Sequence, residues 1–297
     1  MAVEYYAVRG VLGFIGLFPY KVSLAVGKSL GLLLFYLASG ARKTARRNLE
    51  IAFPDNPEDE NLRLARGTFL SIGRHIGFIA QFPYFKKSDI RKLIGLRGKE
   101  HFDKARDAER GILFFTGHFG SWEVFNLLAP AFNEEMNILV RRLDNKRIEN
   151  YIDSLRTKFG AVTLGKREAP RQLYRLLEKG STVGILADLN AQLHDGVFVD
   201  FFGIPASTTK SIAKLTIKTN PVLMPAFAVW DAENRRYTVT LEEPVDYEIT
   251  GDNERDILEI TRKLTNIIER WVRKHPEQWL WIHKRWNTRP EGEESLY

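Results

Sequence analysis

A histidine and a glutamate separated by four residues, His118 and Glu123, form the pair in this sequence best suited to moving a proton. The histidine follows an apolar, β-prone run, Gly111–Thr116, and stands between Gly117 and Gly120. We predict a buried strand, a tight turn that carries the histidine, and a helix that carries the glutamate. The Glu123 carboxylate would then accept the N–H of one imidazole nitrogen and leave the other nitrogen as a base. Such a base can deprotonate a hydroxyl group for attack on an activated acyl carbonyl, so no Ser or Cys nucleophile is needed.

The elements that would position this pair alternate between strand and helix from about residue 94 onward. This alternation predicts an α/β fold with a mostly parallel central sheet flanked by helices. Ligands bind at the carboxyl ends of strands in such sheets, which is where His118 falls. The expected strands are Gly111–Thr116, Asn137–Arg142, Val162–Leu164, Thr182–Ala187, Val222–Val229 and Tyr237–Leu241, the last two as an antiparallel pair. The expected helices are Trp122–Phe132, Asn145–Phe159, Pro170–Lys179, Thr208–Thr219 and Glu254–Lys274.

Two loops at the strand ends supply candidate substrate-binding residues. Gly120 allows a substrate to approach the backbone closely, and Ser121 is placed to cap the helix that follows. Asp188 ends a predicted strand, and Asn190 and Thr208 lie between it and the start of the next helix. Since helix starts attract anions and carbonyl oxygens, we predict that these five residues contribute to a substrate site.

A third set of candidates is basic. Arg141 and Arg142 end a predicted strand, and Lys146 and Arg147 open the next helix. Arginine side chains at strand ends bind phosphate and carboxylate groups well. A solvated helix face would explain Lys146 and Arg147 equally well, so we keep only Arg141 and Arg142 as candidate anion ligands.

The sequence gives little support for a metal or a cofactor. It contains no cysteine, which excludes disulfides, thiolate metal sites and a Cys nucleophile. None of the other histidines forms an HExxH pair, and the grouping of His194 with Asp195 and Asp188 is better explained by a solvated loop. We therefore predict neither.

The N-terminal part of the chain combines apolar character with positive charge. The 297 residues carry a net charge of +7, and residues 1–50 contain seven basic against two acidic side chains. That combination favours a membrane surface over nucleic acid, which would need basic residues beside stacking aromatics. We predict that residues 1–40 form membrane-associating helices and that residues 41–297 form the α/β domain. The charges at the headgroups, Arg42, Lys43, Arg46 and Arg47, favour a cytoplasmic orientation.

How the N-terminal helices meet the membrane stays open at this point. The uncharged runs fall short of the ~18 apolar residues of a spanning helix, and Pro19 is expected to separate two helices. Two helices that lie on or dip into the bilayer are the favoured interpretation. The alternatives are one tilted span over Val22–Ala38, burial of both helices against the domain, and a signal peptide.

The residues around His118 resemble a known family. The stretch Thr116–Glu123, TGHFGSWE, resembles the motif of the lipid A late acyltransferases, the lauroyl and myristoyl transferases of lipid A biosynthesis, within the glycerolipid and lysophospholipid acyltransferase superfamily. His-x4-Glu is weak alone, whereas the whole stretch is specific. Leu189 departs from the family, in which we expect Gln after Asp188. Further similar segments follow in chain order: Val140–Arg142, Ala187-Asp188 with Asp195–Thr209, and His275–Trp279 with Thr288–Gly292.

The resemblance implies an O-acyltransferase that uses the His118–Glu123 dyad as general base. It implies a fatty-acyl donor on acyl carrier protein or coenzyme A, and a phosphorylated glycolipid acceptor such as a lipid A precursor. It also implies a place at the cytoplasmic side of the cell inner membrane, without a metal, a cofactor or an acyl-enzyme intermediate.

Other functions stay open on the sequence. The same chemistry could act on a lysophospholipid or another glycolipid, although Phe201–Pro205 lacks the Glu of a Phe-Pro-Glu-Gly-Thr block, which we expect in lysophosphatidate enzymes. A hydrolase would use water in place of the acceptor. A non-catalytic lipid-binding or membrane-scaffold protein would have no need of His118 and Glu123.

Overall fold

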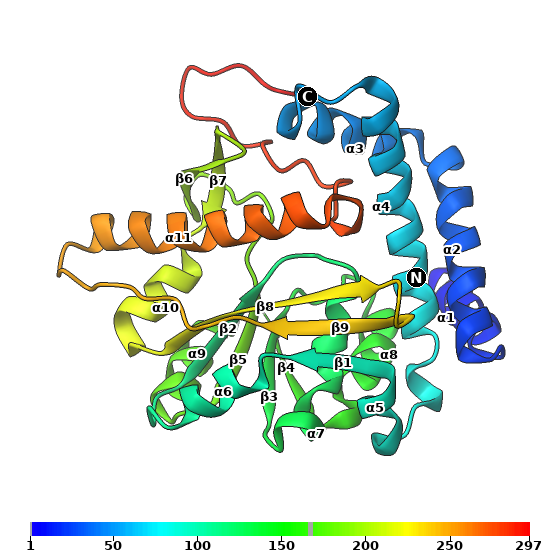
Figure 1. Cartoon of the computed structure of the whole chain (residues 1–297), viewed down its shortest axis with the longest axis horizontal. Helices are drawn as coiled ribbons and strands as arrows, with labels where there is room; N and C mark the ends of the chain where they lie inside the picture. Colours follow the sequence, from blue (N-terminus) through cyan, green and yellow to red (C-terminus); the bar gives the residue numbers. More distant parts are fainter. Residues whose placement is uncertain (1, 166–168) are drawn as a thin grey trace.

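A computed structural model of the chain describes residues 2–165 and 169–297, and it contains a seven-stranded central sheet with helices packed around it (Figure 1). The strand order is β1-β9-β8-β2-β5-β3-β4, and every neighbouring pair is parallel except β8 and β9. The predicted fold class is confirmed. The strands are β1 (Ile94–Arg97), β2 (Ile112–Thr116), β3 (Met136–Val140), β4 (Ala161–Gly165), β5 (Thr182–Leu186), β8 (Val222–Asp231) and β9 (Arg236–Leu241).

The structure also contains strands that the sequence did not predict. The short β1 pairs with β9 at one edge of the sheet. A separate antiparallel hairpin consists of β6 (Gly196–Phe201) and β7 (Ile204–Thr209). The helix predicted from Thr208 was wrong at its start, because β-branched Thr208 pairs with Val197 in this hairpin and α10 begins only at Ser211.

The helices that follow the strands cover both faces of the sheet (Figure 1). The predicted helix Trp122–Phe132 is instead a 3-10 helix, η2 (Trp122–Leu127), followed by a short α7 (Ala129–Phe132), because Pro130 cannot donate a main-chain hydrogen bond back into η2. The last long helix, α11 (Asn253–Lys274), buries Ile260, Leu264, Ile268 and Trp271 against the core at helical spacing. The helices are α5 (Lys87–Leu93), α6 (Lys99–Arg106), α8 (Lys146–Arg156), α9 (Ala169–Glu178), α10 (Ser211–Thr219) and α11 (Asn253–Lys274).

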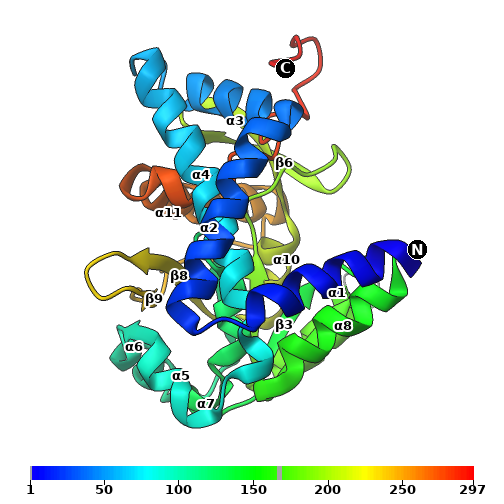
Figure 2. The same ribbon diagram turned by 90° about the vertical axis from the view of Figure 1, so that its right-hand side faces the viewer.

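The N-terminal region forms four helices, α1 (Ala2–Gly16), α2 (Tyr20–Leu37), α3 (Ser39–Ala52) and α4 (Glu58–Ile79). The predicted break at Pro19 is confirmed, since Pro19 directly precedes α2. By length and composition α2 could cross a membrane, and 28% of it is buried. In Figure 2, α2 runs along α4, and α1 lies over α8.

Glycines allow α2 and α4 to touch along their backbones. Gly27 and Gly31 on α2 face Gly73 and Gly77 on α4, and Ser23 Oγ donates a hydrogen bond to Gly77 O at 2.9 Å. A Cβ atom on Gly77 would lie 2.5 Å from the Ser23 carbonyl oxygen. Small residues spaced four apart on both partners are typical of closely packed membrane-protein helices. This contact holds α2 against the helix that carries His75.

We expect Gly27→Ala to destabilise the protein by about 1–3 kcal/mol, because the added methyl group would overlap the Gly73 carbonyl oxygen. The matched control is Gly13→Ala on α1, where the methyl group meets open space and alanine should stabilise the helix by about 0.5–1 kcal/mol. Thermal unfolding in detergent, followed by circular dichroism, measures both. Equal melting temperatures for the two variants would contradict the packing described.

Candidate active site

His118 lies just beyond the carboxyl end of β2 and contacts the carboxylate of Asp188. His118 Nδ1 is 2.7 Å from Asp188 Oδ1, and the main-chain N–H of His118 donates to Asp188 Oδ2 at 2.7 Å. Asp188 follows β5, which pairs with β2 in parallel so that Thr116 lies opposite Leu186. The carboxyl ends of neighbouring strands therefore bring the two residues together, as expected for an α/β sheet.

The Asp188 carboxylate is fully buried and is surrounded by hydrogen-bond donors. Besides the two contacts to His118, Trp279 Nε1 donates to Oδ2 at 2.7 Å. Burial alone would raise the pKa of Asp188, but the charge of His118 and the hydrogen bonds from His118 and Trp279 outweigh it and lower the pKa. Gly117 makes room for this arrangement, because a Cβ atom there would lie 2.9 Å from Oδ2.

This geometry fixes the orientation of the His118 imidazole. An ionised carboxylate only accepts hydrogen bonds, so the neutral ring carries its proton on Nδ1 and the Nε2 lone pair is free. Among the described residues, none bonds to His118 Nε2. A positioned imidazole of this kind can accept a proton from a hydroxyl group, while Asp188 stabilises the imidazolium that forms.

Glu123 does not take the place predicted for it. Its carboxylate bonds to Arg156 of α8, with Arg156 Nη2 at 2.5 Å from Oε1 and Nε at 2.9 Å from Oε2, and Asn126 Nδ2 donates to Oε2 at 2.6 Å. The predicted contact between Glu123 and His118 is wrong, and the local helix geometry explains why. Successive side chains of a 3-10 helix point about 120° apart, so Trp122 faces His118 and Glu123 turns toward α8.

A second histidine lies under the site. His75 of α4 is buried, and its ring lies against Trp122 with the centroids 4.2 Å apart and the planes tilted by 31°. Trp122 in turn contacts the His118 ring edge-to-face. His75 Nδ1 is 2.9 Å from Ser121 Oγ, so Ser121 bonds to His75 and does not cap η2 as predicted. Burial lowers the pKa of His75 to about 4, against the opposing effect of Glu123. No motif in the sequence identified His75, because its contacts depend on the packing of α4 against η2.

The remaining predicted loop residues join the β6–β7 hairpin to the C-terminal segment. Asn190 exchanges hydrogen bonds with Thr288, and its main-chain N–H donates to His283 Nε2 at 3.0 Å. Thr208 Oγ1 accepts from the fully buried Arg285 at 2.5 Å. Burial lowers the pKa of Arg285 to about 10, so this residue keeps its charge at neutral pH, and Asp188 favours that charge. Burial also lowers the pKa of His283.

Gly120 adopts a left-handed conformation with φ +46°, and its N–H donates to Gln278 O at 2.9 Å. A Cβ atom there would lie 2.7 Å from Ala228 O. The tight packing of protein atoms, and not the approach of a substrate that we predicted, therefore accounts for this glycine.

The two candidate anion-binding arginines differ in their surroundings. Arg142 Nη1 lies 2.9 Å from Glu149 Oε1 and 2.7 Å from Asp153 Oδ1, and Nη2 donates to Thr163 O. These contacts make Arg142 a structural link between β3, β4 and α8. Arg141 is exposed.

In residues 2–165 and 169–297, no group of three or more His, Cys, Asp or Glu side chains is placed to hold a metal ion. His194 is exposed and lies 3.5 Å from Asp195, while Asp188 is occupied by His118.

Comparison with known proteins shows the family to which the chain belongs. The family model described as bacterial lipid A biosynthesis acyltransferase matches residues 1–288. The chain belongs to this family. It is 25% identical to the lipid A biosynthesis acyltransferase 2 of Shigella flexneri, in an alignment that covers 98% of this chain and 91% of that protein. It is 26% identical both to the palmitoleoyltransferase and to the lauroyltransferase of lipid A biosynthesis in Escherichia coli (strain K12), with 97% of this chain and 92% of each relative covered.

Membership of the lipid A biosynthesis acyltransferase family makes this chain an acyltransferase. His118 lies in Thr116–Glu123, the stretch that resembles the family motif, and Asp188, 70 residues further along the chain, pairs with its ring at 2.7 Å.

We expect the stability of the protein to fall as the pH drops from 7 toward 5. Below about pH 6.5 His75 becomes protonated in the unfolded chain, whereas in the folded protein it stays neutral down to about pH 4. The free energy of unfolding therefore falls by about 2 kcal/mol by pH 5. His75→Gln removes this titration, and its amide can still bond to Ser121. Chemical unfolding at pH 7 and pH 5 should show the smaller loss in the variant, and an equal loss in both proteins would contradict the buried neutral state.

Proposed function

We propose that this protein transfers a fatty-acyl chain from an acyl thioester to a hydroxyl group of a phosphorylated glycolipid, a lipid A precursor. The names of its relatives support this substrate class. The main support for this reaction is the contact between His118 Nδ1 and the buried Asp188 carboxylate, which lie 2.7 Å apart.

The reaction needs a proton acceptor and then a proton donor, and His118 can serve as both. His118 Nε2 takes the proton of the acceptor hydroxyl as its oxygen forms a bond to the thioester carbonyl carbon. The tetrahedral intermediate collapses with cleavage of the C–S bond, and the imidazolium returns the proton to the leaving thiolate. Asp188 stabilises the imidazolium between these steps. General-base assistance of this kind is worth about 10²–10⁴ in rate.

Glu123 receives a supporting role in this proposal. Its side chain and that of Arg156 are mostly buried, and the pair ties η2 to α8 immediately after the His118 turn. It thereby keeps Trp122 between the rings of His118 and His75. We therefore place Glu123 as a positioning residue and Asp188 as the partner of the base.

The membrane is the proposed place of the reaction. Large apolar side chains are exposed along α1 and α2, and exposed apolar patches of this kind mark interaction surfaces. We propose that these helices, within residues 1–40, hold the enzyme at the cytoplasmic side of the inner membrane, where acyl carrier protein or coenzyme A can deliver the acyl chain. The exposed residues are Val3, Tyr6, Val11 and Phe14 on α1, Leu17 directly after it, and Val22, Leu33, Tyr36 and Leu37 on α2.

The first test of the function is product formation. Detergent-solubilised protein is mixed with acyl–acyl carrier protein and a tetra-acylated lipid A precursor, and the products are analysed by mass spectrometry. Wild-type protein should add one acyl mass, and His118→Ala should lower the rate by at least about 10²-fold because the base is lost. Asp188→Asn should cost a similar factor, because the amide favours the wrong tautomer. Equal addition by wild type and His118→Ala would remove His118 from the mechanism.

Glu123→Gln separates positioning from direct chemistry. Loss of the carboxylate leaves Arg156 buried without its counter-ion, so we expect a stability loss of about 3 kcal/mol together with lower activity. Glu123→Gln/Arg156→Met removes both charges and should recover much of the stability. Unfolding midpoints and acyl-transfer rates are measured on the same preparations. Normal stability in Glu123→Gln with activity abolished would contradict the positioning role.

A further inference from the structure

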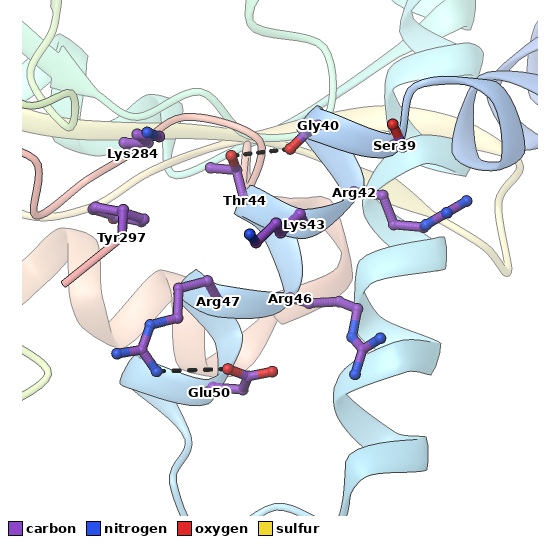
Figure 3. A pocket seen from close by; sticks show the side chains of 10 residues that line it. All are labelled: Ser39, Gly40, Arg42, Lys43, Thr44, Arg46, Arg47, Glu50, Lys284 and Tyr297. Carbon is purple, nitrogen blue, oxygen red and sulfur yellow. Dashed lines mark hydrogen bonds and ion pairs between the residues drawn. The ribbon is translucent and has the colours of Figure 1, made fainter.

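A groove with a volume of about 770 Å³ runs along α3, outside the His118 site (Figure 3). In Figure 3 Lys284 and Tyr297, from the end of the chain, lie beside the side chains of α3. The walls carry five basic side chains and a single acidic one, Glu50. The basic residues are Arg42, Lys43, Arg46, Arg47 and Lys284.

Asn48 and Arg47 of α3 form hydrogen bonds with the C-terminal segment and so join the two parts of the chain that line the groove. Asn48 Nδ2 donates to Trp281 O at 2.7 Å and to His283 O at 2.6 Å, and its Oδ1 accepts from the Tyr297 hydroxyl. Arg47 Nε donates to Leu296 O at 2.7 Å. The C-terminal segment is therefore fixed against α3, and Lys284 has a defined place in the wall.

The five cations are not equally engaged within the protein. Arg42 Nη1 donates to the carbonyl oxygens of Phe35 and Tyr36 at the end of α2, and Arg46 pairs with Glu58 at 2.6 Å. Lys43 and Lys284 are exposed, and neither forms an ion pair with a carboxylate in the described part of the chain. The Lys284 ammonium group lies over the Tyr297 ring, 5.3 Å from its centroid, which leaves its N–H donors to solvent. Two ammonium groups are thus available to an anion from solution.

The position of the groove indicates which anion it suits. At one end the Arg42 contacts join it to the end of α2, where Leu33, Tyr36 and Leu37 are exposed. A lipid combines apolar chains for such a surface with a charged headgroup for the neighbouring cations. A soluble acidic protein would present carboxylates to these cations, but its charged surface would offer no apolar area to cover the exposed leucines.

We infer that the α3 groove binds the phosphate groups of an anionic lipid headgroup, with Lys43 and Lys284 as the principal ligands. The headgroup could belong to the glycolipid acceptor or to the surrounding phospholipid, because both present phosphate to the same cations. At the other end of the groove Lys284 adjoins His283, whose ring bonds to the main chain of Asn190 near Asp188. A lipid headgroup held at Lys284 would therefore contact the chain segment that leads through His283 to the His118–Asp188 pair. The binding itself does not depend on the proposed acyl transfer.

Vesicle binding tests the inference without any reaction. Wild-type protein and Lys43→Gln/Lys284→Gln are sedimented with phosphatidylcholine vesicles that contain or lack phosphatidylglycerol. The double variant should bind the anionic vesicles about 10- to 30-fold more weakly than wild type, and the neutral vesicles equally well. The control is Lys92→Gln/Lys104→Gln, which removes two exposed lysines on α5 and α6, remote from α3 in Figure 1. An equal loss of binding to anionic vesicles in both double variants would show general charge attraction and would overturn the inference.

Steady-state kinetics distinguishes the two sources of phosphate. A higher KM for the lipid A precursor in Lys43→Gln/Lys284→Gln, with kcat retained, identifies the acceptor. An unchanged KM with weaker binding to anionic vesicles identifies the bulk phospholipid. A higher KM for acyl–acyl carrier protein alone, with vesicle binding intact, would overturn the inference in favour of an acidic protein. Wild-type protein that binds anionic vesicles through the groove but transfers no acyl chain would contradict only the proposed function.

Discussion

A carboxylate removed from water must find hydrogen-bond donors in the protein, and Asp188 finds them in the His118 ring, the His118 main chain and the Trp279 indole. Together these three contacts keep the carboxylate ionised and turn the imidazole so that Nε2 is free. The site depends on this arrangement more than on any other, because removing one donor would leave a buried charge under-satisfied. It also explains why Gly117 stands between β2 and the histidine.

Distant parts of the chain meet to build this environment. The parallel pairing of β2 and β5 sets His118 opposite Asp188, and the C-terminal segment supplies Trp279. The same segment accepts the Gly120 N–H and positions Arg285 near Asp188. On the other side, α4 places His75 against Trp122 and is itself packed on the apolar α2. An uninterrupted series of contacts therefore links the proposed membrane helices to the base.

The sequence predicted correctly those features that depend on residues close together in the chain. The apolar runs predicted the strands of the central sheet apart from the short β1, and the strand-end position identified His118 as the candidate base. The partner of His118 could not be chosen in this way, because Glu123 is near in sequence whereas Asp188 is near only after β2 and β5 pair. His75 escaped prediction for the same reason. Arg142 fitted an anion site by type and position, but Glu149 and Asp153, further along the chain, bind it.

The proposed reaction depends on one atom, Nε2 of His118, as its proton acceptor. Nitrogen NMR of ¹⁵N-histidine-labelled protein in detergent reads the protonation of each ring nitrogen directly, and a His118→Gln sample assigns the signal. We predict that neutral His118 carries its proton on Nδ1, with Nε2 unprotonated, and that this preference is lost in Asp188→Asn. A proton on Nε2 in the wild-type protein would contradict the assignment of His118 as a base held by Asp188.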